Sequence, residues 1–325
     1  MRSGDPRLWR PSRAALLALL LLWVAPAWAA DEAGALLMRM AEAMSRQAYE
    51  GTLVYEHGDR LESMAIVHGY IDGLEYERLR VLSGEPFEII REGGKLTCVW
   101  PAEHRMLVDQ RPGDLLAPKP PSNLRSLPAH YRAELGGTAR IAGREARILR
   151  IEGEDRYRYG YRMWIDMETG LLLRSDLIGR KGMVYERIMF THIEPLYTVG
   201  RERFEPSLEG EEYSRHGDPA ADTTRLEDPD WEMTDLPPGF RLVSHRNQAM
   251  PPHGEAVQHS VYTDGLASVS IFVEPADTDA MLLRGLSRMG AVHALGREIE
   301  GHQVTVVGEV PAATVKHVAR GVRQW

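Results

Sequence analysis

The sequence has little of three things that would point to a particular chemistry. It contains one cysteine, Cys98, so no disulfide can form within the chain and no multi-cysteine metal centre can be built. It has no excess of positive charge, since 39 Lys and Arg face 47 Asp and Glu and give a net charge of −8. Nucleic-acid-binding domains are normally basic, so we expect no nucleic-acid partner. We predict that Cys98 is a small buried thiol in a strand.

The third absence is that of catalytic signatures. The sequence has no G-x-S-x-G, H-E-x-x-H, G-x-x-x-x-G-K-[ST] or G-x-G-x-x-G motif. The acidic residues of 228–235 lack the glycine spacing of a calcium loop and are interpreted as a solvated linker, and the twelve histidines are scattered. We therefore predict no catalytic residue, no cofactor and no metal, and a protein that is not an enzyme.

Long apolar runs are also missing, apart from one near the amino terminus. Arginines precede an apolar run at 14–25, and small residues around Ala29 and Ala30 are followed by acidic ones. This order is typical of a secretory signal peptide, and a run of about 12 apolar residues is too short to span a bilayer as an anchor. We predict a signal peptide at residues 1–30, cleavage near Ala29/Ala30 and a location in the periplasm.

The remaining chain is long enough for two hydrophobic cores. Apolar residues at three- and four-residue steps predict a helix from Glu32 to Arg46, and short β-rich runs separated by glycine turns follow as far as Ile193. These runs are too close for crossover helices, so the sheet should be antiparallel. Large aliphatic residues then nearly vanish. We predict a large domain at 31–204, a linker at 205–230 and a small α+β domain at 231–325. The small domain should have an antiparallel sheet and a C-terminal helix that Pro311 opens.

The segment 156–166 carries the most distinctive pattern. If it is one continuous strand, alternation places two sets of side chains on opposite faces. One face carries Arg156, Arg158, Arg162 and Trp164. The other carries Tyr157, Tyr159, Tyr161, Met163 and Ile165. Such a strand suits an amphiphile, because rings cover acyl chains and guanidinium groups bind phosphate. It suits a partner peptide or a core-facing tyrosine ladder as well.

Two further strands are apolar on both faces and so need cover on each side. These are residues 64–67 and 171–173. The first helix can cover one face, and either a ligand or an ordinary core can cover the other.

Taken together, several motifs resemble the RseB/MucB family of periplasmic sigma-factor regulators. They occur in order along the whole chain after the signal peptide and are Gly51-Thr52, Val54-Tyr55, Arg158-Tyr159-Gly160-Tyr161, Asp166, Thr169-Gly170, Glu186-Arg187, Leu236-Pro237-Pro238-Gly239-Phe240, Tyr262, Asp264-Gly265-Leu266 and Val307-Gly308-Glu309-Val310-Pro311. Two positions depart from the family's usual residues. Leu172 stands where proline is usual and Asp235 where tryptophan is usual, and Trp231 can take the place of the latter.

The resemblance implies a fold and a function. The large domain would be an unclosed antiparallel β half-barrel covering helices, similar to the lipoprotein carriers LolA and LolB. The protein would bind the periplasmic part of a membrane anti-sigma factor and shield it from proteolysis, and a lipid such as lipopolysaccharide would release it. Our hypothesis for the lipid site is Tyr157, Tyr159, Tyr161, Met163, Met64, Ile66 and Leu173, with Arg158 and Arg162 near the rim.

Two other functions remain open at this point. A periplasmic lipid or lipoprotein carrier without a regulatory role would have no need of the second domain. An exported hydrolase with an unrecognised site is the third possibility. The sequence also leaves a homo-oligomer open.

Overall fold

The computed structural model describes residues 25–109, 127–207, 214–216, 231–249, 256–276 and 283–324. The predicted signal peptide falls mostly outside these residues, as does most of the predicted linker. The predicted cleavage site near Ala29/Ala30 lies within the first helix of the structure, α2 (Ala25–Arg46), which begins before the predicted start at Glu32.

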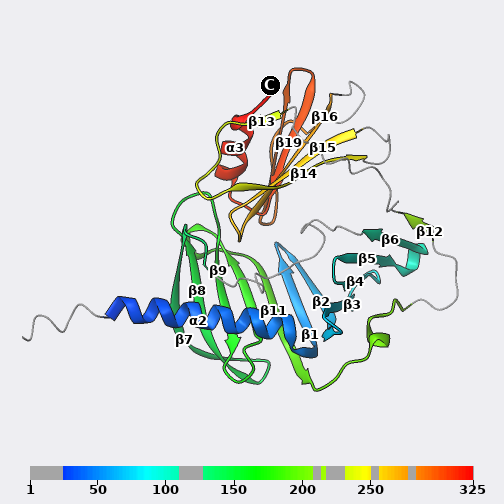
Figure 1. Ribbon diagram of the computed structural model, residues 1–325, viewed down its shortest axis with the longest axis vertical. Coiled ribbons are helices and arrows are strands. Elements are labelled where there is room, and N and C mark those ends of the chain that lie inside the picture. Colours follow the sequence, from blue (N-terminus) through cyan, green and yellow to red (C-terminus); the bar gives the residue numbers. More distant parts are fainter. Residues whose placement is uncertain are drawn as a thin grey trace, which may run out of the picture.

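Most of the first part of the chain forms one large sheet (Figure 1). Its strands, in chain order, are β1 (Ala48–His57), β2 (Arg60–Ile71), β3 (Leu74–Val81), β4 (Glu88–Glu92), β5 (Lys95–Trp100), β6 (Arg105–Asp109), β7 (Tyr131–Ile141), β8 (Arg144–Gly153), β9 (Gly160–Asp166), β10 (Leu172–Ile178), β11 (Val184–Leu196) and β12 (Ser214–His216). Within the described ranges, 3-10 turns accompany them at Pro101–Glu103, Arg180–Gly182 and Arg201–Phe204.

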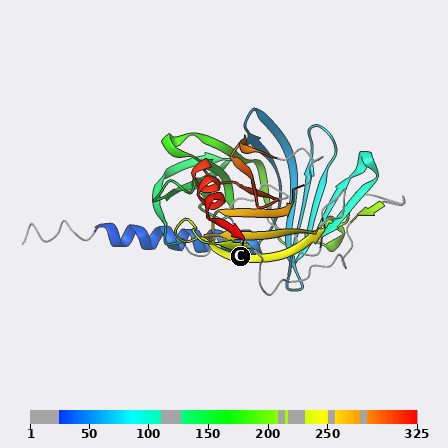
Figure 2. The ribbon, with the colours of Figure 1, turned by 90° about the horizontal axis from the view of Figure 1, so that it is seen from above.

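The sheet is antiparallel and is not closed. Its order is β12-β6-β5-β4-β3-β2-β1-β11-β10-β9-β8-β7, and only the short β12 is parallel to its neighbour, β6. The end strands β12 and β7 do not pair, and Figure 2 shows the sheet curving from the green strands to the cyan ones without meeting. This confirms the predicted half-barrel. Strands β3, β6, β7 and β12 were not predicted, and β12 lies within the predicted linker.

Tight turns explain why neighbouring strands run in opposite directions. Asp72-Gly73 joins β2 to β3 and Ala142-Gly143 joins β7 to β8, with positive φ at both positions of each turn. Two-residue turns of this kind match the right-handed twist of the strands that they connect. The local sequence therefore sets the antiparallel pairing before any core forms.

Helix α2 contributes side chains to the hydrophobic core on the curved sheet. In Figure 1 it crosses β7, β8 and β9. Its buried side chains include Leu37 and Met40, which pack with Met163 and Ile165 of β9. A second apolar cluster continues along β1 to β5 and includes Cys98, which is buried as predicted. The helix that the sequence predicts therefore covers the inner side of the sheet.

The rest of the chain forms the predicted small α+β domain. A six-stranded sheet has the order β14-β15-β16-β19-β18-β17, and a two-stranded sheet pairs β13 with β20. The bounds are β13 (Trp231–Met233), β14 (Arg241–Ala249), β15 (Ala256–Thr263), β16 (Ser268–Pro275), β17 (Gly285–Met289), β18 (Val292–Ile299), β19 (His302–Gly308), α3 (Ala312–Gly321) and β20 (Val322–Gln324). Pro311 occupies the N-cap position of α3 and makes no side-chain hydrogen bond there. Strands β13, β17, β18 and β20 were not predicted.

Candidate functional site

A cavity lies in the large sheet where β1, β2, β3, β10 and β11 surround it. Its volume is about 70 Å³. Ligand pockets commonly have mostly apolar linings. The apolar side chains around this one are Met44, Leu53, Met64, Ile66, Leu79, Leu172, Leu173, Ile188 and Phe190. The cavity therefore has a lining that suits an apolar group.

Polar side chains line the cavity as well, and they are Tyr49, His68, Glu75, Glu77, Arg91, Arg174 and Ser175. The buried His68 stacks on Tyr49 with 4.9 Å between ring centroids, and its Nε2 lies 3.3 Å from Glu75 Oε1. Arg91 pairs with Glu77 at 3.0 Å. Burial raises the pKa of the Tyr49 hydroxyl well above its usual value, and the Glu77 and Glu75 carboxylates raise it further. The lining therefore carries two carboxylates and two guanidinium groups beside its apolar side chains.

Three of the residues in the lipid hypothesis line the cavity. They are Met64, Ile66 and Leu173, which come from β2 and β10. Met163 lies elsewhere, fully buried in the cluster under α2, and Tyr161 packs against the same cluster. The structure therefore divides the proposed residues between two places.

One prediction about this region is wrong: 156–166 is not a single strand. Strand β9 begins only at Gly160, and its pairing with β8 ends at Ile151 opposite Tyr161. The Asp155 carboxylate accepts a hydrogen bond from the Tyr157 amide at 2.8 Å, which is an Asx turn. Residues 156–159 therefore belong to the β8–β9 connection, and the predicted alternation of faces does not apply to them.

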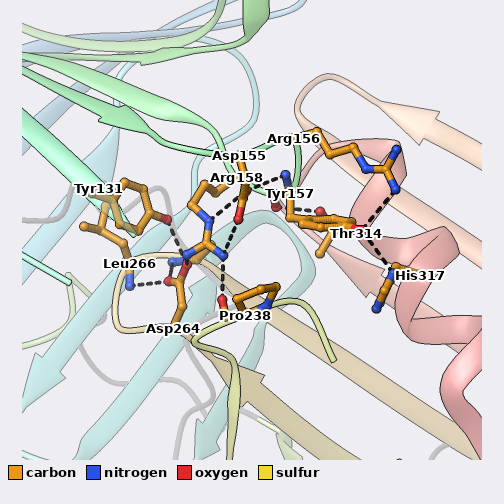
Figure 3. A network of polar contacts seen from close by, with 11 residues as sticks. Tyr131, Asp155, Arg156, Tyr157, Arg158, Pro238, Asp264, Leu266, Thr314 and His317 are labelled. Carbon is orange, nitrogen blue, oxygen red and sulfur yellow. Dashed lines mark hydrogen bonds and ion pairs between the residues drawn. The ribbon is translucent and has the colours of Figure 1, made fainter. Parts of the chain in front are cut away.

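Within that connection, Arg158 reaches into the second domain (Figure 3). Its Nη1 donates to Asp264 Oδ2 at 2.8 Å and its Nη2 donates to the Pro238 carbonyl oxygen at 2.7 Å. The side chain is 0% exposed and that of Asp264 is 1% exposed. Asp155 supplies a second carboxylate at 3.0 Å. Arg158 is therefore part of a buried interdomain ion pair rather than a cavity rim.

The Asp264 carboxylate is satisfied from several directions. Tyr131 donates to its Oδ2 at 3.0 Å, and the amides of Leu266 and Ala267 donate to its Oδ1 at 2.9 and 2.8 Å. Burial raises the pKa of the Tyr131 hydroxyl well above its usual value, and the Asp264 charge adds to this. A buried carboxylate with this many donors is held in one position.

Tyr157 and Tyr159 also bind the second domain. Thr314 on α3 donates to the Tyr157 carbonyl oxygen at 2.5 Å, and the Tyr157 hydroxyl lies 3.2 Å from His317 Nδ1 (Figure 3). The Tyr159 hydroxyl donates to the Ala291 carbonyl oxygen at 3.1 Å. Two side chains from the hypothesis therefore make polar contacts between the domains.

Arg162 lies apart from both the cavity and this interface. It is opposite Asp176 and Arg150 in the sheet register, and its guanidinium is 6.0 Å from the Trp164 ring centroid. The Asp176 carboxylate itself binds Arg174 at 2.7 Å and Arg187 at 3.0 Å. Arg162 is thus beside an ion-pair network of the sheet.

The sequence did not show the partners of this connection or the polar lining of the cavity. Asp264 stands in a motif of the resemblance, and it also accepts hydrogen bonds from amides of its own turn. The contacts of Pro238 and Thr314 gave no signal because their partners, Arg158 and Tyr157, lie far away in the sequence. In the residues that the structure describes, no group of three or more His, Cys, Asp or Glu side chains could hold a metal ion. Over the same residues, every helix is too short or too polar to cross a membrane.

The fold and the site define a class: a two-domain protein whose open antiparallel sheet carries a cavity and is joined to the second domain by a buried ion pair. Its sequence matches the MucB/RseB N-terminal domain over residues 32–208 and the MucB/RseB C-terminal domain over residues 225–323. The chain belongs to the MucB/RseB family.

Relatives and solved structures agree with this assignment over most of the chain. The sigma factor AlgU regulatory protein MucB of Pseudomonas aeruginosa is 34% identical and covers 95% of this chain and 96% of its own. The sigma-E factor regulatory protein RseB of Escherichia coli K12 is 26% identical over 93% of this chain and 94% of its own. The structure of the Pseudomonas aeruginosa MucA/MucB complex is 29% identical with a TM-score of 0.70, covering 90% of this chain and 99% of that chain.

Proposed function

We propose that this protein holds an envelope-stress sigma factor in check from the periplasm. It binds the periplasmic part of a membrane-spanning anti-sigma factor, shields that part from the protease that would cut it, and releases it when a lipid occupies the cavity. The protein acts by binding and catalyses no reaction.

The observation that carries this proposal is the match of both domains to a regulator whose complex structure is known. MucB is 34% identical over 95% of the chain, and a structure of MucB in complex with MucA(peri) superposes on 90% of it with a TM-score of 0.70. A likeness that spans both domains supports a binding mode that uses both. The contact between the domains is therefore relevant to partner binding.

The cavity supports the lipid part of the proposal. Burial of a methylene group contributes about 0.8 kcal/mol, so about seven buried methylenes supply the roughly 5.5 kcal/mol of differential affinity that moves a two-state equilibrium from 1:99 to 99:1. The apolar lining formed by Leu53, Ile66 and Phe190 suits an acyl chain.

A reconstituted protection assay tests the proposal. Protein beginning at residue 31 is mixed with the periplasmic segment of the anti-sigma factor from the same genome and with the protease that cuts it. We expect slow cleavage in the presence of this protein, and fast cleavage again after a lipid A analogue is added. Cleavage that proceeds equally fast with and without this protein would contradict the regulatory function.

A cavity variant and its control test the lipid site. Ile66→Trp fills the cavity, and we expect it to weaken lipid A binding at least tenfold while the segment is still protected. Leu61→Trp adds the same ring at an exposed position on the same strand and should bind lipid normally. Equal affinity of the two variants, measured by titration, would move the lipid site elsewhere.

The second candidate, a lipid or lipoprotein carrier, is favoured by the same cavity. A pull-down from a membrane extract separates the two functions. An anti-sigma factor as the main retained protein supports regulation, and lipoproteins support transport.

A further inference from the structure

A short segment of the chain packs across β2 and β3 of the large sheet. It comprises residues 199–207, which follow β11, and we call it the strap. Its buried Phe204 ring lies 5.3 Å from the ring of Tyr76 on β3. Gly69 on β2 is opposite Tyr76 in the register, and a Cβ there would collide with Val199 Cγ1 and lie 3.1 Å from the Phe204 ring. Only a glycine at position 69 therefore lets the strap approach the sheet this closely.

Polar contacts tie the first part of the strap to the sheet. Arg201 Nη2 donates to Asp72 Oδ2 at 2.9 Å, in the turn between β2 and β3. Arg203 pairs with Glu50 on β1. These side chains are partly or fully exposed, so each pair contributes little stability by itself. Together they set the direction in which the strap crosses the strands.

A buried carboxylate holds the other end of the strap. The Glu88 side chain on β4 is 7% exposed and pairs with Arg78 at 3.0 Å. It accepts a hydrogen bond from the Ser207 amide at 3.3 Å and another from the Ser207 hydroxyl. Arg78 also donates to the Arg203 carbonyl oxygen at 3.4 Å. Hydrogen bonds to an ionised carboxylate are stronger than those between neutral groups, so the strap is anchored at this end as well.

The opposite side of the same two strands is a wall of the cavity. His68 precedes Gly69, and Glu75 and Glu77 flank Tyr76. Successive side chains of a strand point to opposite faces of the sheet. His68, Glu75 and Glu77 line the cavity, so the residues between them face away from it. The strap therefore packs on the back of this wall.

The cavity in this structure is too small for the acyl chain proposed above. Its volume is about 70 Å³. An apolar cavity of about 150 Å³ holds one benzene molecule, which has fewer carbon atoms than the seven methylenes of the lipid. The cavity must therefore widen when an acyl chain enters. Its wall of β2 and β3 can move outward only if the strap gives way.

We propose that the strap is a gate for the cavity. While Phe204 is packed on Tyr76, β2 and β3 keep the cavity narrow, and an acyl chain enters when the strap lifts from these strands. The gate rests on the proposed lipid site and adds a closed state that must open before the lipid binds. The smaller the fraction of molecules with a lifted strap, the weaker the apparent affinity for the lipid.

A reversible cross-link tests the gate. Gly69→Cys and Val199→Cys, in a Cys98→Ala background, bring two thiols together, because a Cβ at position 69 reaches the Val199 side chain. The mature protein, beginning at residue 31, is titrated with cis-parinaric acid, a fatty acid that fluoresces in apolar surroundings. We expect the oxidised protein to bind this fatty acid about tenfold more weakly than the same protein after reduction. Cys98→Ala alone should bind it equally in both conditions.

A strap variant tests the gate without a cross-link. Phe204→Ala removes the ring that packs on Tyr76, so the strap lifts more often, and we expect about tenfold tighter binding of the fatty acid. Tyr197→Ala removes a fully exposed ring just before the strap and is the matched control. It should bind the fatty acid like the parent.

Equal affinity of the oxidised and the reduced protein overturns the gate, as does parent-like binding by Phe204→Ala. Binding of the fatty acid by none of these proteins overturns the lipid site together with the gate. Failure of the protection assay would leave these titrations unaffected, because no anti-sigma segment and no protease are present in them.

Discussion

Arg158 is the residue on which the contact between the domains most depends. Its guanidinium is removed from water and is compensated by two carboxylates and a carbonyl oxygen. The rings of Tyr131 and Phe240 lie 5.3 and 5.6 Å from it, which adds cation–π contacts. A buried charge of this kind is costly unless every partner is present, so the network stabilises the arrangement of the domains in this structure.

Removal of one partner from this network should be strongly destabilising. Asp264→Ala leaves Arg158 buried beside a vacant position, and we expect a loss of about 3–5 kcal/mol in the free energy of unfolding. Urea denaturation followed by tryptophan fluorescence measures it. Arg132→Ala, which breaks an exposed ion pair with Glu152, is the control and should cost less than about 1 kcal/mol. Similar losses in both variants would mean that the buried pair contributes no more than a surface one.

The Asp176 carboxylate makes the stability of the sheet sensitive to low pH. Burial alone would raise the pKa of Asp176, but hydrogen bonds from Arg174 and Arg187 outweigh it and hold the pKa below its usual value of 3.8. A lowered pKa contributes stability that is present above pH 3.8 and is lost as the pH falls below it. We expect Asp176→Asn to flatten the fall of the melting temperature between pH 4 and 2. Asp72→Asn, at an exposed position, should melt like the parent at each pH.

At the scale of elements, α2 is the piece that makes an open sheet stable. A sheet that does not close has an inner face to cover, and the helix covers part of it with a stripe that includes Leu37 and Met40. The remaining uncovered part near β1 and β2 is where the cavity forms. Core and cavity are thus two sections of the same inner surface.

Two methionines two residues apart on α2 test this role. Met40 is 0% exposed against the sheet and Met38 is 56% exposed. We expect Met40→Ala to lower the free energy of unfolding by about 2–5 kcal/mol, because it removes buried methylenes and leaves a void. Met38→Ala should stay within about 0.5 kcal/mol of the parent. Chemical denaturation of both variants measures these losses in the free energy of unfolding. Equal losses would show that the helix does not pack as described.

At the scale of the whole molecule, the interdomain contact and the cavity are connected through neighbouring strands of the large sheet. The connection that carries Tyr157, Arg158 and Tyr159 leads directly into β9, and β9 pairs with β10, which lines the cavity. If lipid and anti-sigma segment prefer different arrangements of the domains, each must weaken the binding of the other by the same factor.

This reciprocity is open to measurement. We expect the lipid A analogue to weaken binding of the anti-sigma segment and the segment to weaken binding of the lipid by an equal factor of 5–150, corresponding to about 1–3 kcal/mol of coupling. Calorimetric titrations in both orders give the two factors. In Asp264→Ala, where the interdomain pair is broken, both factors should approach one. Unequal factors would show that the two ligands do not act through one equilibrium.

Much of this architecture follows from interactions between residues that are close together in the sequence. Glycine turns such as Asp72-Gly73, the apolar stripe of α2 and the proline before α3 act within a few residues, so the antiparallel sheet, the first helix and the last helix are predictable. Met64, Ile66 and Leu173 were predictable as a group because strands that are apolar on both faces need cover on both. The missed strands β7 and β17 lie at sheet edges, where alternation is weak.

The tertiary structure alone decided what the aromatic and arginine segment does. By sequence, residues 156–159 continue β9, and only the Asx turn at Asp155 with the contacts to Asp264, Ala291 and Thr314 takes them out of the sheet. These partners lie more than 100 residues away. The alternation of side chains along a strand indicates which of them share a face. The position of a buried guanidinium such as that of Arg158 is set instead by the carboxylate that compensates its charge. Where that carboxylate lies is a property of the folded chain.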